Sequence, residues 1–237
     1  MKAVINSFVM MLSLIKRDFM LFAACLAPIL AGLFFKLGIP MIETILREQF
    51  SMNQVIGPYY GIIDMCYTML SPILFCFIAA MIVLEERDDR ITNYMLVTPL
   101  GKFGYLFTRL GIPAGISFVI TALLLPLISL TDLTLLMSII CSIAGTLQGF
   151  VVSLLIVVIS SNKLEGMAVT KLSTITMFGM IIPYVIPSNI QYIGSVLPSF
   201  WFGKIMYEQQ FLYIIPTVIV AFTWIGLLAR RYLKRIF

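Results

Sequence analysis

The sequence predicts an all-α integral membrane protein with six transmembrane helices, for three reasons. Hydrophobic residues make up 61% of the 237 positions and charged residues only 11%, whereas soluble domains carry about 25% charged residues. The mean hydropathy of +1.05 leaves too few polar side chains to cover a globule in water. Long uncharged runs recur along the chain, and a helix needs roughly 20 apolar residues to cross a bilayer core of about 30 Å. We expect residues 1–237 to form a single transmembrane domain.

The N-terminal stretch alternates polar and apolar side chains at helical spacing, and its apolar runs are too short to cross a membrane. We expect residues 1–18 to form an amphipathic helix in the cytosolic interface, with Lys16 and Arg17 toward the anionic headgroups of membrane lipid. Residues 22–25 look superficially like a lipoprotein cleavage site. Too few apolar residues precede that site for a signal peptide, and the apolar residues continue beyond it to Phe35. We therefore expect no processing there.

The next part of the chain predicts two spans and an outer loop. The first span is expected over Phe19–Phe35, loosened near Pro28, and its apolar character continues to Ile42. Residues 43–62 carry charged and turn-forming side chains and predict an outer loop. Residues 65–84 are uncharged over one membrane crossing and predict the second span.

Four further runs predict the remaining spans: residues 110–131, 133–162, 172–187 and 209–229. The run 133–162 is too short for two spans and a turn, so we expect one long tilted helix. The charged residues between 163 and 171 predict a short inner loop. Helix-disrupting residues lie at Pro183, Pro187, Gly194 and Pro198, so we expect short outer helices over 188–208 that re-enter the membrane interface.

Basic residues predict the orientation. With both termini in the cytosol, all 16 basic residues except Lys36, Arg47 and Lys204 lie on the inner side, whereas the acidic residues divide almost evenly. This is the bias that the positive-inside rule describes. We therefore expect a multi-pass protein of the plasma membrane with both termini cytosolic. The net charge of +5 then reflects topology and predicts no binding to nucleic acid.

Motifs for catalysis and metal binding are missing. The four cysteines lie within apolar runs, without C-x-x-C spacing and without any histidine in the chain: Cys25, Cys66, Cys76 and Cys141. We expect them to be small buried hydrophobic side chains rather than disulfides or metal ligands. Neither a P-loop nor a hydrolase motif occurs. We expect no catalytic residue, no metal site and no cofactor bound by this chain, so it is not predicted to be an enzyme.

The middles of the predicted spans carry no charged side chain. A charge at the centre of a bilayer is costly and is normally kept only for function, as in ion-coupled carriers. Energy for transport is therefore expected to come from another protein. Asp64 is the nearest candidate for a proton site, but its position at the outer end of a run favours a solvated or capping role.

The stretch 85–109 is the one strongly polar segment in the middle of the chain, with eight charged side chains. Ile91, Tyr94 and Met95 are spaced to share one apolar face of a short helix. Four acidic residues precede these positions, and we expect them at the N-terminal end of that helix, where the helix dipole favours them.

The short helix is expected to end at residues 98–99, and Gly101 and Gly104 then turn the chain back. An apolar face outside the membrane needs a partner. Residues 85–104 are therefore predicted to form a cytosolic segment on which another protein acts. The alternative is a solvated inner loop whose charges only set the topology.

The order of these features resembles the type-2 ABC exporter permease family. In that family an acidic cluster, a short cytosolic helix, a Ser/Thr-Pro-Leu pattern and an aromatic-Leu pair precede the third span, as residues 85–109 do here. The N-terminal helix ending in Lys-Arg-Asp-Phe (16–19) and the outer Leu-Pro-Ser-Phe-Trp segment (197–201) also match. The resemblance thus covers the whole chain. Residues 89–91 depart from it, because the family often has a Gly-Thr pair there.

The resemblance implies a bacterial permease that pairs with a second copy of itself or with a homologous permease. Two separate ATPase subunits, which bind ATP and Mg²⁺, would complete the complex. The segment 86–100 would be the coupling helix that docks on the ATPase. The coupling residues implied in this way are Glu86, Arg87, Asp88, Asp89, Arg90, Ile91, Tyr94, Met95 and Pro99.

In that family the substrate path lies at the dimer interface, lined chiefly by the second and fifth spans. Carried over, its residues are Tyr67, Met69, Leu70, Phe75, Phe77, Thr174, Met177, Phe178, Met180, Ile181 and Tyr184. A wall rich in Met and Phe suits hydrophobic or amphipathic cargo, so we expect export of an amphipathic peptide, a drug or a lipid. The alternative for each wall residue is an ordinary contact with lipid or helices. The alternatives for the protein are an ion-coupled carrier or channel, and a non-transporting scaffold or immunity protein.

Overall fold

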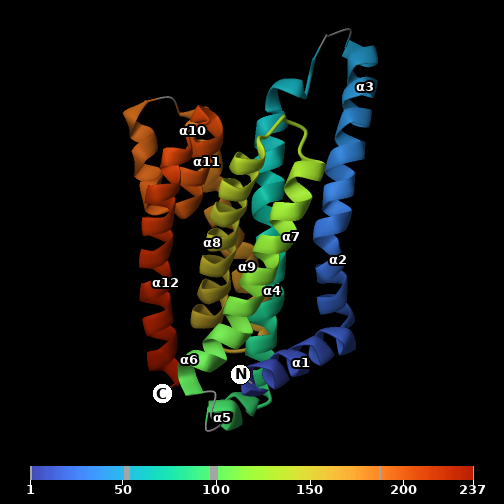
Figure 1. The fold of residues 1–237 in the computed structure, drawn as a ribbon. Coiled ribbons are helices and arrows are strands. Elements are labelled where there is room, and N and C mark those ends of the chain that lie inside the picture. The colour runs from blue at the N-terminus through green and yellow to red at the C-terminus, as the bar shows by residue number, and fades with distance from the viewer. Residues whose placement is uncertain (1, 51–53, 97–100, 187, 237) are drawn as a thin grey trace.

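In the computed structural model, the helix α4 (Tyr60–Asp88) is the element around which the others pack. It contacts α8 (Leu135–Ile159) most extensively, and also α7 (Ile112–Ile128) and α2 (Phe19–Leu33). Figure 1 shows α4 inside the bundle, with α2 and α12 (Ile214–Ile236) on opposite flanks. The structure describes residues 2–50, 54–96, 101–186 and 188–236.

Within the described residues, six helices are long and apolar enough to cross a membrane: Phe19–Gln49, Gly57–Asp88, Phe103–Ile128, Leu135–Ile159, Lys163–Val185 and Phe211–Lys234. The all-α fold with six spans is therefore confirmed. Both ends of the chain and the short helix α5 (Ile91–Leu96) lie at the same end of the bundle, which we call the termini end (Figure 1). An even number of crossings requires this arrangement.

The N-terminal helix α1 (Lys2–Arg17) runs across the termini end at a steep angle to the bundle (Figure 1), as an interfacial helix would. Asp18 separates α1 from α2 because its carboxylate accepts hydrogen bonds from the backbone N–H groups of Met20, at 2.9 Å, and Leu21. This is a helix N-cap, which satisfies donors that the first turn leaves free. The cap forces a sharp change of direction where the interfacial helix meets the first span.

The first span is longer than expected. The helix continues past α2 through a π-helical turn, η1 (Phe34–Gly38), into α3 (Ile39–Phe50). The outer loop predicted over 43–62 is therefore wrong in its first half. Glu43 forms an i,i+4 ion pair with Arg47 at 3.0 Å and accepts the N–H groups of residues 55 and 56, so these charges support helix. A helix of this length rises about 46 Å and extends beyond a bilayer core.

The polar segment after the second span also differs from the prediction. Helix α4 runs to Asp88, so Glu85, Glu86 and Asp88 lie at the C-terminal end of α4 and not at the start of α5. Arg90 has a left-handed backbone with φ of 58° and reverses the chain into α5. Only a short polar connection then separates α4 from the third span. That this end faces the cytosol is a proposal.

The third span begins in two helical pieces, α6 (Gly101–Leu106) and the π-helical η3 (Phe107–Gly111), which lead into α7. Gly101 has a φ of 63°, a conformation that glycine adopts without steric cost. Gly104 lies inside α6, so the turn predicted there is wrong. Pro99 lies outside the described residues.

The fourth span is one helix, α8, as predicted, and it packs tightly on α4 at two glycines. A Cβ at Gly145 would collide with the backbone carbonyl of Thr68, and one at Gly149 would press on the backbone of Pro72. Small residues at this spacing let two helices approach closely. Cys76 and Cys141 are buried in this region, Cys25 and Cys66 are half-buried, and all four are free thiols.

The fifth span starts earlier than predicted. Helix α9 (Lys163–Ser173) is followed by the 3₁₀-helix η4 (Thr174–Ile181) and by α10 (Ile182–Val185). The inner loop predicted over 163–171 is wrong, because the Asn162 side chain caps α9 by accepting the N–H of Glu165 at 2.8 Å. The connection between the fourth and fifth spans is therefore very short.

The region before the last span is helical, as predicted for 188–208. It contains η5 (Asn189–Val196) and α11 (Pro198–Glu208), and η6 (Phe211–Tyr213) then leads into α12. Figure 1 shows α10 and α11 packed together at the end opposite the termini, and α11 contacts η4 and α12. Lys204 lies in α11 at this end and is buried, and its Nζ donates to Tyr192 Oη at 3.0 Å and to Glu208 at 2.9 Å.

Candidate functional site

The candidate site lies at the termini end, where α4 ends. We call the last turn of α4, residues 85–88, the polar hub. At its centre Glu86 and Arg109 form a buried ion pair, with side chains 1% and 0% exposed. The Arg109 Nε donates to Glu86 Oε2 at 2.9 Å, and its Nη2 donates to Oε1. A bidentate pair of this kind fixes both distance and orientation.

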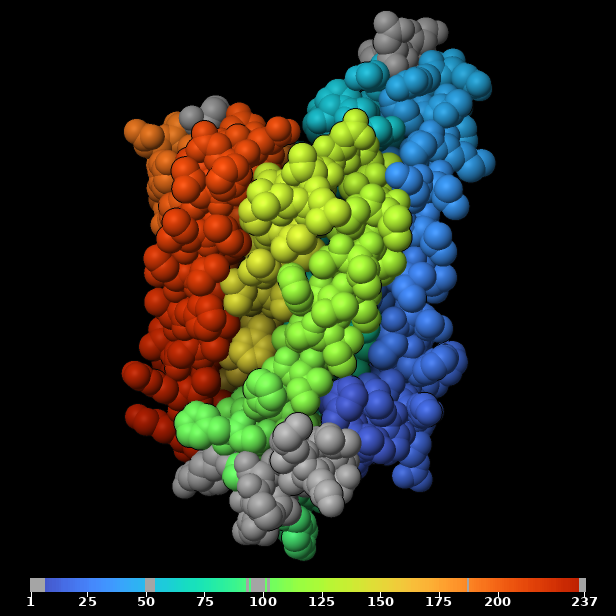
Figure 2. Space-filling view, in the orientation of Figure 1, coloured from blue at the N-terminus to red at the C-terminus, as the bar shows by residue number. Residues whose placement is uncertain are grey.

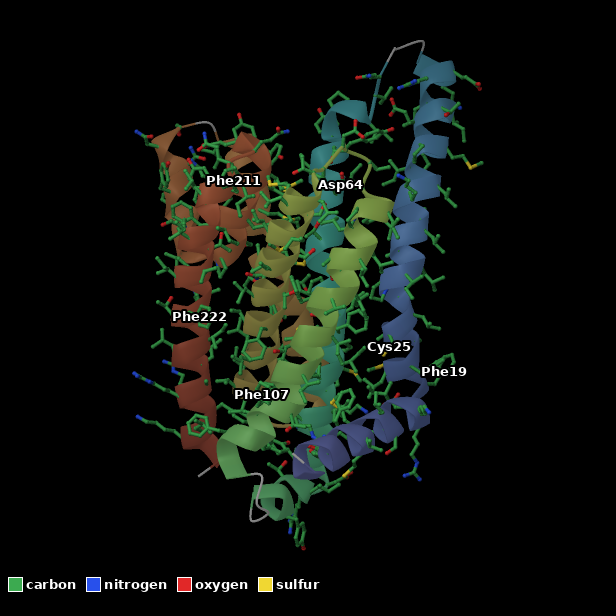
Figure 3. The ribbon with its side chains drawn as sticks, in the orientation of Figure 1. Phe19, Cys25, Asp64, Phe107, Phe211 and Phe222 are labelled. Atoms are coloured by element: carbon green, nitrogen blue, oxygen red, sulfur yellow. The ribbon has the colours of Figure 1, made fainter. Side chains whose placement is uncertain are left out.

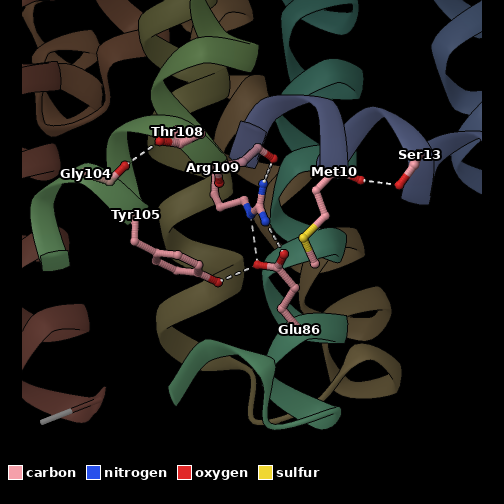
Figure 4. A network of polar contacts seen from close by, with 8 residues as sticks. Met10, Ser13, Glu86, Gly104, Tyr105, Thr108 and Arg109 are labelled. Atoms are coloured by element: carbon pink, nitrogen blue, oxygen red, sulfur yellow. Dashed lines mark hydrogen bonds and ion pairs between the residues drawn. The ribbon is translucent and has the colours of Figure 1, made fainter. Parts of the chain in front are cut away.

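Two further groups complete this pair. The Tyr105 hydroxyl donates to Glu86 Oε2 at 2.9 Å, and Arg109 Nη1 donates to the backbone carbonyl of Ser7 at 2.6 Å. Figure 4 shows Tyr105 and Arg109 converging on Glu86. Tyr105 and Arg109 are four residues apart, so they lie on one helical face. The network therefore ties α1, α4 and the start of the third span together.

A second network joins the hub to α9 and to the junction of α1 and α2. The Lys163 ammonium donates to Asp18 at 2.7 Å and to Glu85 at 2.9 Å, and the Lys163 backbone N–H donates to Asp88 at 2.9 Å. The hydrogen bond from Lys163 lowers the pKa of Asp18, although partial burial opposes this effect, and the N–H of Met20 adds to the lowering. Asp18 is thus held in its charged form.

The remaining hub residue, Arg87, reaches the other side of the bundle. Its Nη1 and Nη2 donate to the backbone carbonyls of Ser160, at 2.8 Å, and Val157, at 3.2 Å, at the end of α8. The guanidinium also lies 5.6 Å from the centre of the Tyr232 ring in α12, within the range of a cation–π contact. The four hub residues together contact α6, η3, α8, α9 and α12, and Arg109 connects them to α1.

The surface beside the hub is aromatic. Tyr94 on α5 is 74% exposed and Phe103 on α6 is 78% exposed. Asp89 and Arg90, between α4 and α5, are also exposed. An exposed tyrosine and phenylalanine so close in sequence, next to a buried polar network, form a surface that can receive a partner.

The predicted coupling residues therefore separate into two groups. Glu86 and Arg87 are directed into the bundle and bind its own elements, whereas Asp88, Asp89, Arg90 and Tyr94 are exposed and Ile91 is half-buried. The side chain of Met95 and the whole of Pro99 lie outside the described residues. Sequence reasoning missed Tyr105, Arg109 and Lys163. The signal was present, because the Tyr-x-x-x-Arg spacing places a charge at the start of an apolar run.

The predicted path residues do not share one surface of this single chain. Tyr67, Met69 and Met180 are buried in the core, and Tyr67 meets the ring of Phe35 edge-on at 6.0 Å. Thr174 and Phe178 are exposed on the fifth span. The others are half-buried: Leu70, Phe75, Phe77, Met177, Ile181 and Tyr184.

The two spans also turn different faces outward. Phe75 borders an apolar cavity of about 120 Å³ beneath α1, together with residues of α2 and α7. Tyr184 instead packs against Tyr207 of α11, with the ring centres 4.8 Å apart. In Figure 2, α12, α8, α7 and α2 follow one another across one face of the molecule. The exposed apolar side chains of α12 and α7 include Phe222, Leu123 and Leu127.

Contrary to the prediction, Asp64 is neither solvated nor a helix cap, because it is buried within α4 and binds the connection between α7 and α8. Its carboxylate is 3% exposed and accepts the backbone N–H groups of Leu130, at 2.9 Å, and Thr131, at 2.9 Å, as well as the Thr131 hydroxyl. These bonds hold the connection between α7 and α8 at the end opposite the termini, where Figure 3 labels Asp64. No group of three or more metal-binding acidic or cysteine side chains occurs among the residues that the structure describes.

Comparison with known proteins gives three findings. Residues 11–230 match the family described as "Fluoroquinolones export permease protein Rv2686c-like". The chain is also 26% identical over 194 residues to the fluoroquinolones export permease protein Rv2686c of Mycobacterium tuberculosis strain H37Rv, and equally to protein MT2760 of strain CDC 1551. These alignments cover 79% of this chain and 75% of each relative. No solved structure matches.

Proposed function

Because the chain belongs to the Rv2686c-like family of export permeases, we propose that it is the transmembrane subunit of an ATP-driven exporter. Its energy would come from a separate ATPase subunit that docks on α5 and its flanking residues, because this sequence has no P-loop. The termini end would face the cytosol of a bacterial cell, as the basic residues require. Two ATPase subunits, carrying ATP and Mg²⁺, and a second permease would complete the complex.

The observation that carries this proposal is the polar hub. Helix α5 follows the hub directly, and the hub residues bind α8, α9, α12 and η3 and, through Arg109, α1. A force on α5 would therefore reach several spans at once through short charged contacts. A solvated loop that only set topology would leave these charges in water.

The proposed cargo is an amphipathic, drug-like molecule of the fluoroquinolone class, since both relatives are named for export of those drugs. Aromatic and methionine side chains suit planar, weakly polar molecules because they adapt their shape. We place the path at an interface with a second permease, where the exposed Thr174 and Phe178 of the fifth span would contribute. Peptide or lipid cargo is the less favoured choice, because neither relative is named for it.

The test of the docking surface is Tyr94→Asp combined with Met95→Asp in the permease, co-expressed with its ATPase. We expect loss of the ATPase from the purified complex and loss of drug export, because two carboxylates would disrupt an apolar contact. Tyr59→Asp is the matched control, since Tyr59 is 58% exposed and lies near the start of α4, at the other end of the bundle.

The variant and control permeases should show equal amounts in the membrane and equal thermal stability. Unchanged ATPase association and export in the double variant would contradict the docking assignment. Export that follows an ion gradient in vesicles without any ATPase would instead establish an ion-coupled carrier.

A further inference from the structure

A cavity of about 460 Å³ opens at the end of the bundle opposite the termini. Its walls come from the start of α4, the connection between α7 and α8, the first turn of α8, the end of α11, and η6. The volume falls within the range of about 300–1,000 Å³ that small-molecule sites occupy. None of the residues predicted for the substrate path lines it. Figure 3 labels Phe211, one of its wall residues, at this end of the molecule.

The polar side of this cavity carries one charge, the carboxylate of Asp132. Asp132 is exposed, and among the described residues it forms no hydrogen bond or ion pair. The nearby acid Asp64 is already occupied by Leu130 and Thr131. Asp132 is therefore the carboxylate among the residues lining the cavity that is free to meet a ligand.

Two cations near this end are already bound by other groups. The Lys36 ammonium donates to the Ser129 carbonyl at 3.1 Å. The Lys204 ammonium donates to Glu208 at 2.9 Å and lies 4.6 Å from the centre of the Tyr192 ring. No cation among the residues lining the cavity neutralises Asp132.

The backbone around Asp132 is held in place on both sides. Thr131 is fixed by the buried carboxylate of Asp64, and the Leu133 N–H donates to the Thr131 carbonyl at 2.8 Å. Thr134 caps α8 by accepting the N–H of Met137 at 3.3 Å. Because the loop is already ordered, less conformational entropy is lost when a ligand binds to its carboxylate.

Apolar side chains make up much of the remaining wall of the cavity. Met137 and Met206 are nearly buried, and Leu136 and Phe211 are exposed. Gln209 has a left-handed backbone with φ of 52°, which turns the chain from α11 into η6 and places Gln209 and Phe211 in the wall. Such a conformation is costly for a residue with a Cβ, and it persists only where the surrounding structure requires it.

We propose that this cavity is a binding site for an amphipathic organic cation, whose positive charge pairs with Asp132 and whose apolar body contacts Leu136, Met137, Met206 and Phe211. Thioether and aromatic side chains suit such a body, and a carboxylate at the rim selects positive charge. The site lies within one chain. It therefore needs neither a second permease nor the proposed export function.

The test uses the full-length protein in lipid nanodiscs and two probes of the same shape and opposite charge, tetraphenylphosphonium and tetraphenylborate. Empty nanodiscs measure partition into lipid. We expect saturable binding of the cation, and Asp132→Asn to weaken it roughly five- to tenfold, as the loss of a partly solvated charge pair would. Asp132→Glu should restore binding, and Asp89→Asn, at the termini end, should leave it unchanged.

A second variant tests the cavity itself. Leu136→Trp places a large side chain in the cavity from an exposed position and should remove saturable binding of the cation. Cation binding equal to that of empty nanodiscs would overturn the proposal, and so would equal affinity in wild type, Asp132→Asn and Leu136→Trp. Drug export is measured separately in cells. Failure of export together with Asp132-dependent binding would reject the proposed function and leave this site standing.

Discussion

The guanidinium of Arg109 donates to the backbone carbonyl of Ser7 at 2.6 Å, across 102 positions of the chain. The same guanidinium holds the carboxylate of Glu86. One side chain therefore fixes the interfacial helix, the end of the second span and the start of the third relative to one another. Any movement of α4 at this end must move α1 as well or break a buried ion pair.

The first prediction concerns this ion pair. Arg109→Met or Glu86→Leu leaves the partner charge buried without its counter-ion, which typically costs about 3–5 kcal/mol. We expect either single variant to lower the free energy of unfolding by that amount. The double variant should recover most of the loss, since two apolar side chains leave no unpaired charge. Unfolding in detergent, followed as a double-mutant cycle, measures the coupling.

The control for this cycle is Arg231→Met, which removes an exposed arginine from the same end of the molecule. Its effect should stay within about 0.5 kcal/mol, as for most surface substitutions. If Arg109→Met costs no more than Arg231→Met, the pair does not hold the three segments together.

The second prediction compares a glycine that lies against another helix, Gly145, with a glycine that faces open space, Gly115. Gly145→Ala should destabilise the fold by about 1–3 kcal/mol, because the new Cβ would collide with the Thr68 carbonyl and separate α8 from α4. Gly115→Ala should be neutral or stabilising, since no atom lies within 4 Å of a Cβ at that position and alanine favours helix by up to about 1 kcal/mol. Thermal unfolding of both variants in detergent tests this, and equal effects would contradict it.

Much of the fold could be predicted from the sequence because hydrophobic length and charge decide membrane crossing. The two loops that were predicted where the chain is helical share one cause. Charged residues at 43, 47, 163 and 165 suggested loops, yet residues 43 and 47 form an i,i+4 pair, residue 165 is capped by Asn162, and residue 163 forms ion pairs with other elements. The sequence shows where charged side chains occur. It does not show whether each one is solvated by water or paired with another group of the protein.

The candidate site was predictable in place but not in detail. The charged stretch 85–109 pointed to the termini end, and the exposure of Tyr94 agrees with a docking surface there. The inward direction of Glu86 depends on Arg109, 23 residues later in the chain. The cavity beside Asp132 combines three stretches distant in sequence, at residues 61, 131–137 and 206–211, and no local pattern could bring them together.

The third prediction is a pH dependence at Asp18. Its pKa lies below the ordinary value of about 3.9, because Lys163 donates to it, against the effect of partial burial. The ion pair therefore contributes full stability above that value and loses it as the pH falls through the lowered pKa of the folded state. We expect Asp18→Asn, which preserves the helix cap, to be less stable than wild type near pH 7.

The difference between the two proteins should begin to narrow as the pH falls below about 4, where Asp18 of the unfolded state becomes protonated, and it should close only below the lowered pKa of folded Asp18. Melting temperatures measured between pH 3 and pH 7 test this. In a Lys163→Met background, the pH-dependent effect of Asp18→Asn should be smaller, because only the N–H groups of Met20 and Leu21 still donate to the carboxylate. A gap of the same size at pH 3 as at pH 7 would show that the charge of Asp18 is not its source, because unfolded Asp18 is mostly protonated at pH 3.

The last prediction concerns the 3₁₀-helix η4 in the fifth span. It runs for eight residues, whereas 3₁₀ segments longer than three to four residues are uncommon because their hydrogen bonds are poorly aligned. Two bonds hold its first turn: the Gln148 Nε2 donates to the Thr176 hydroxyl at 2.9 Å, and the Ser199 hydroxyl donates to the Thr176 carbonyl. Gln148 is wholly buried in the middle of α8.

Thr176→Val removes the acceptor and leaves the Gln148 amide buried without that partner, which should cost about 1–3 kcal/mol. Adding Gln148→Leu should recover much of the loss, because two apolar side chains can pack where the hydrogen bond was. If the hydrogen bond restrains η4, spin labels at the two ends of the segment should also move about 4 Å closer in Thr176→Val, since an α-helix rises 0.5 Å less per residue than a 3₁₀-helix. Additive losses with unchanged label distances would show that this hydrogen bond neither couples the two spans nor maintains the 3₁₀ geometry.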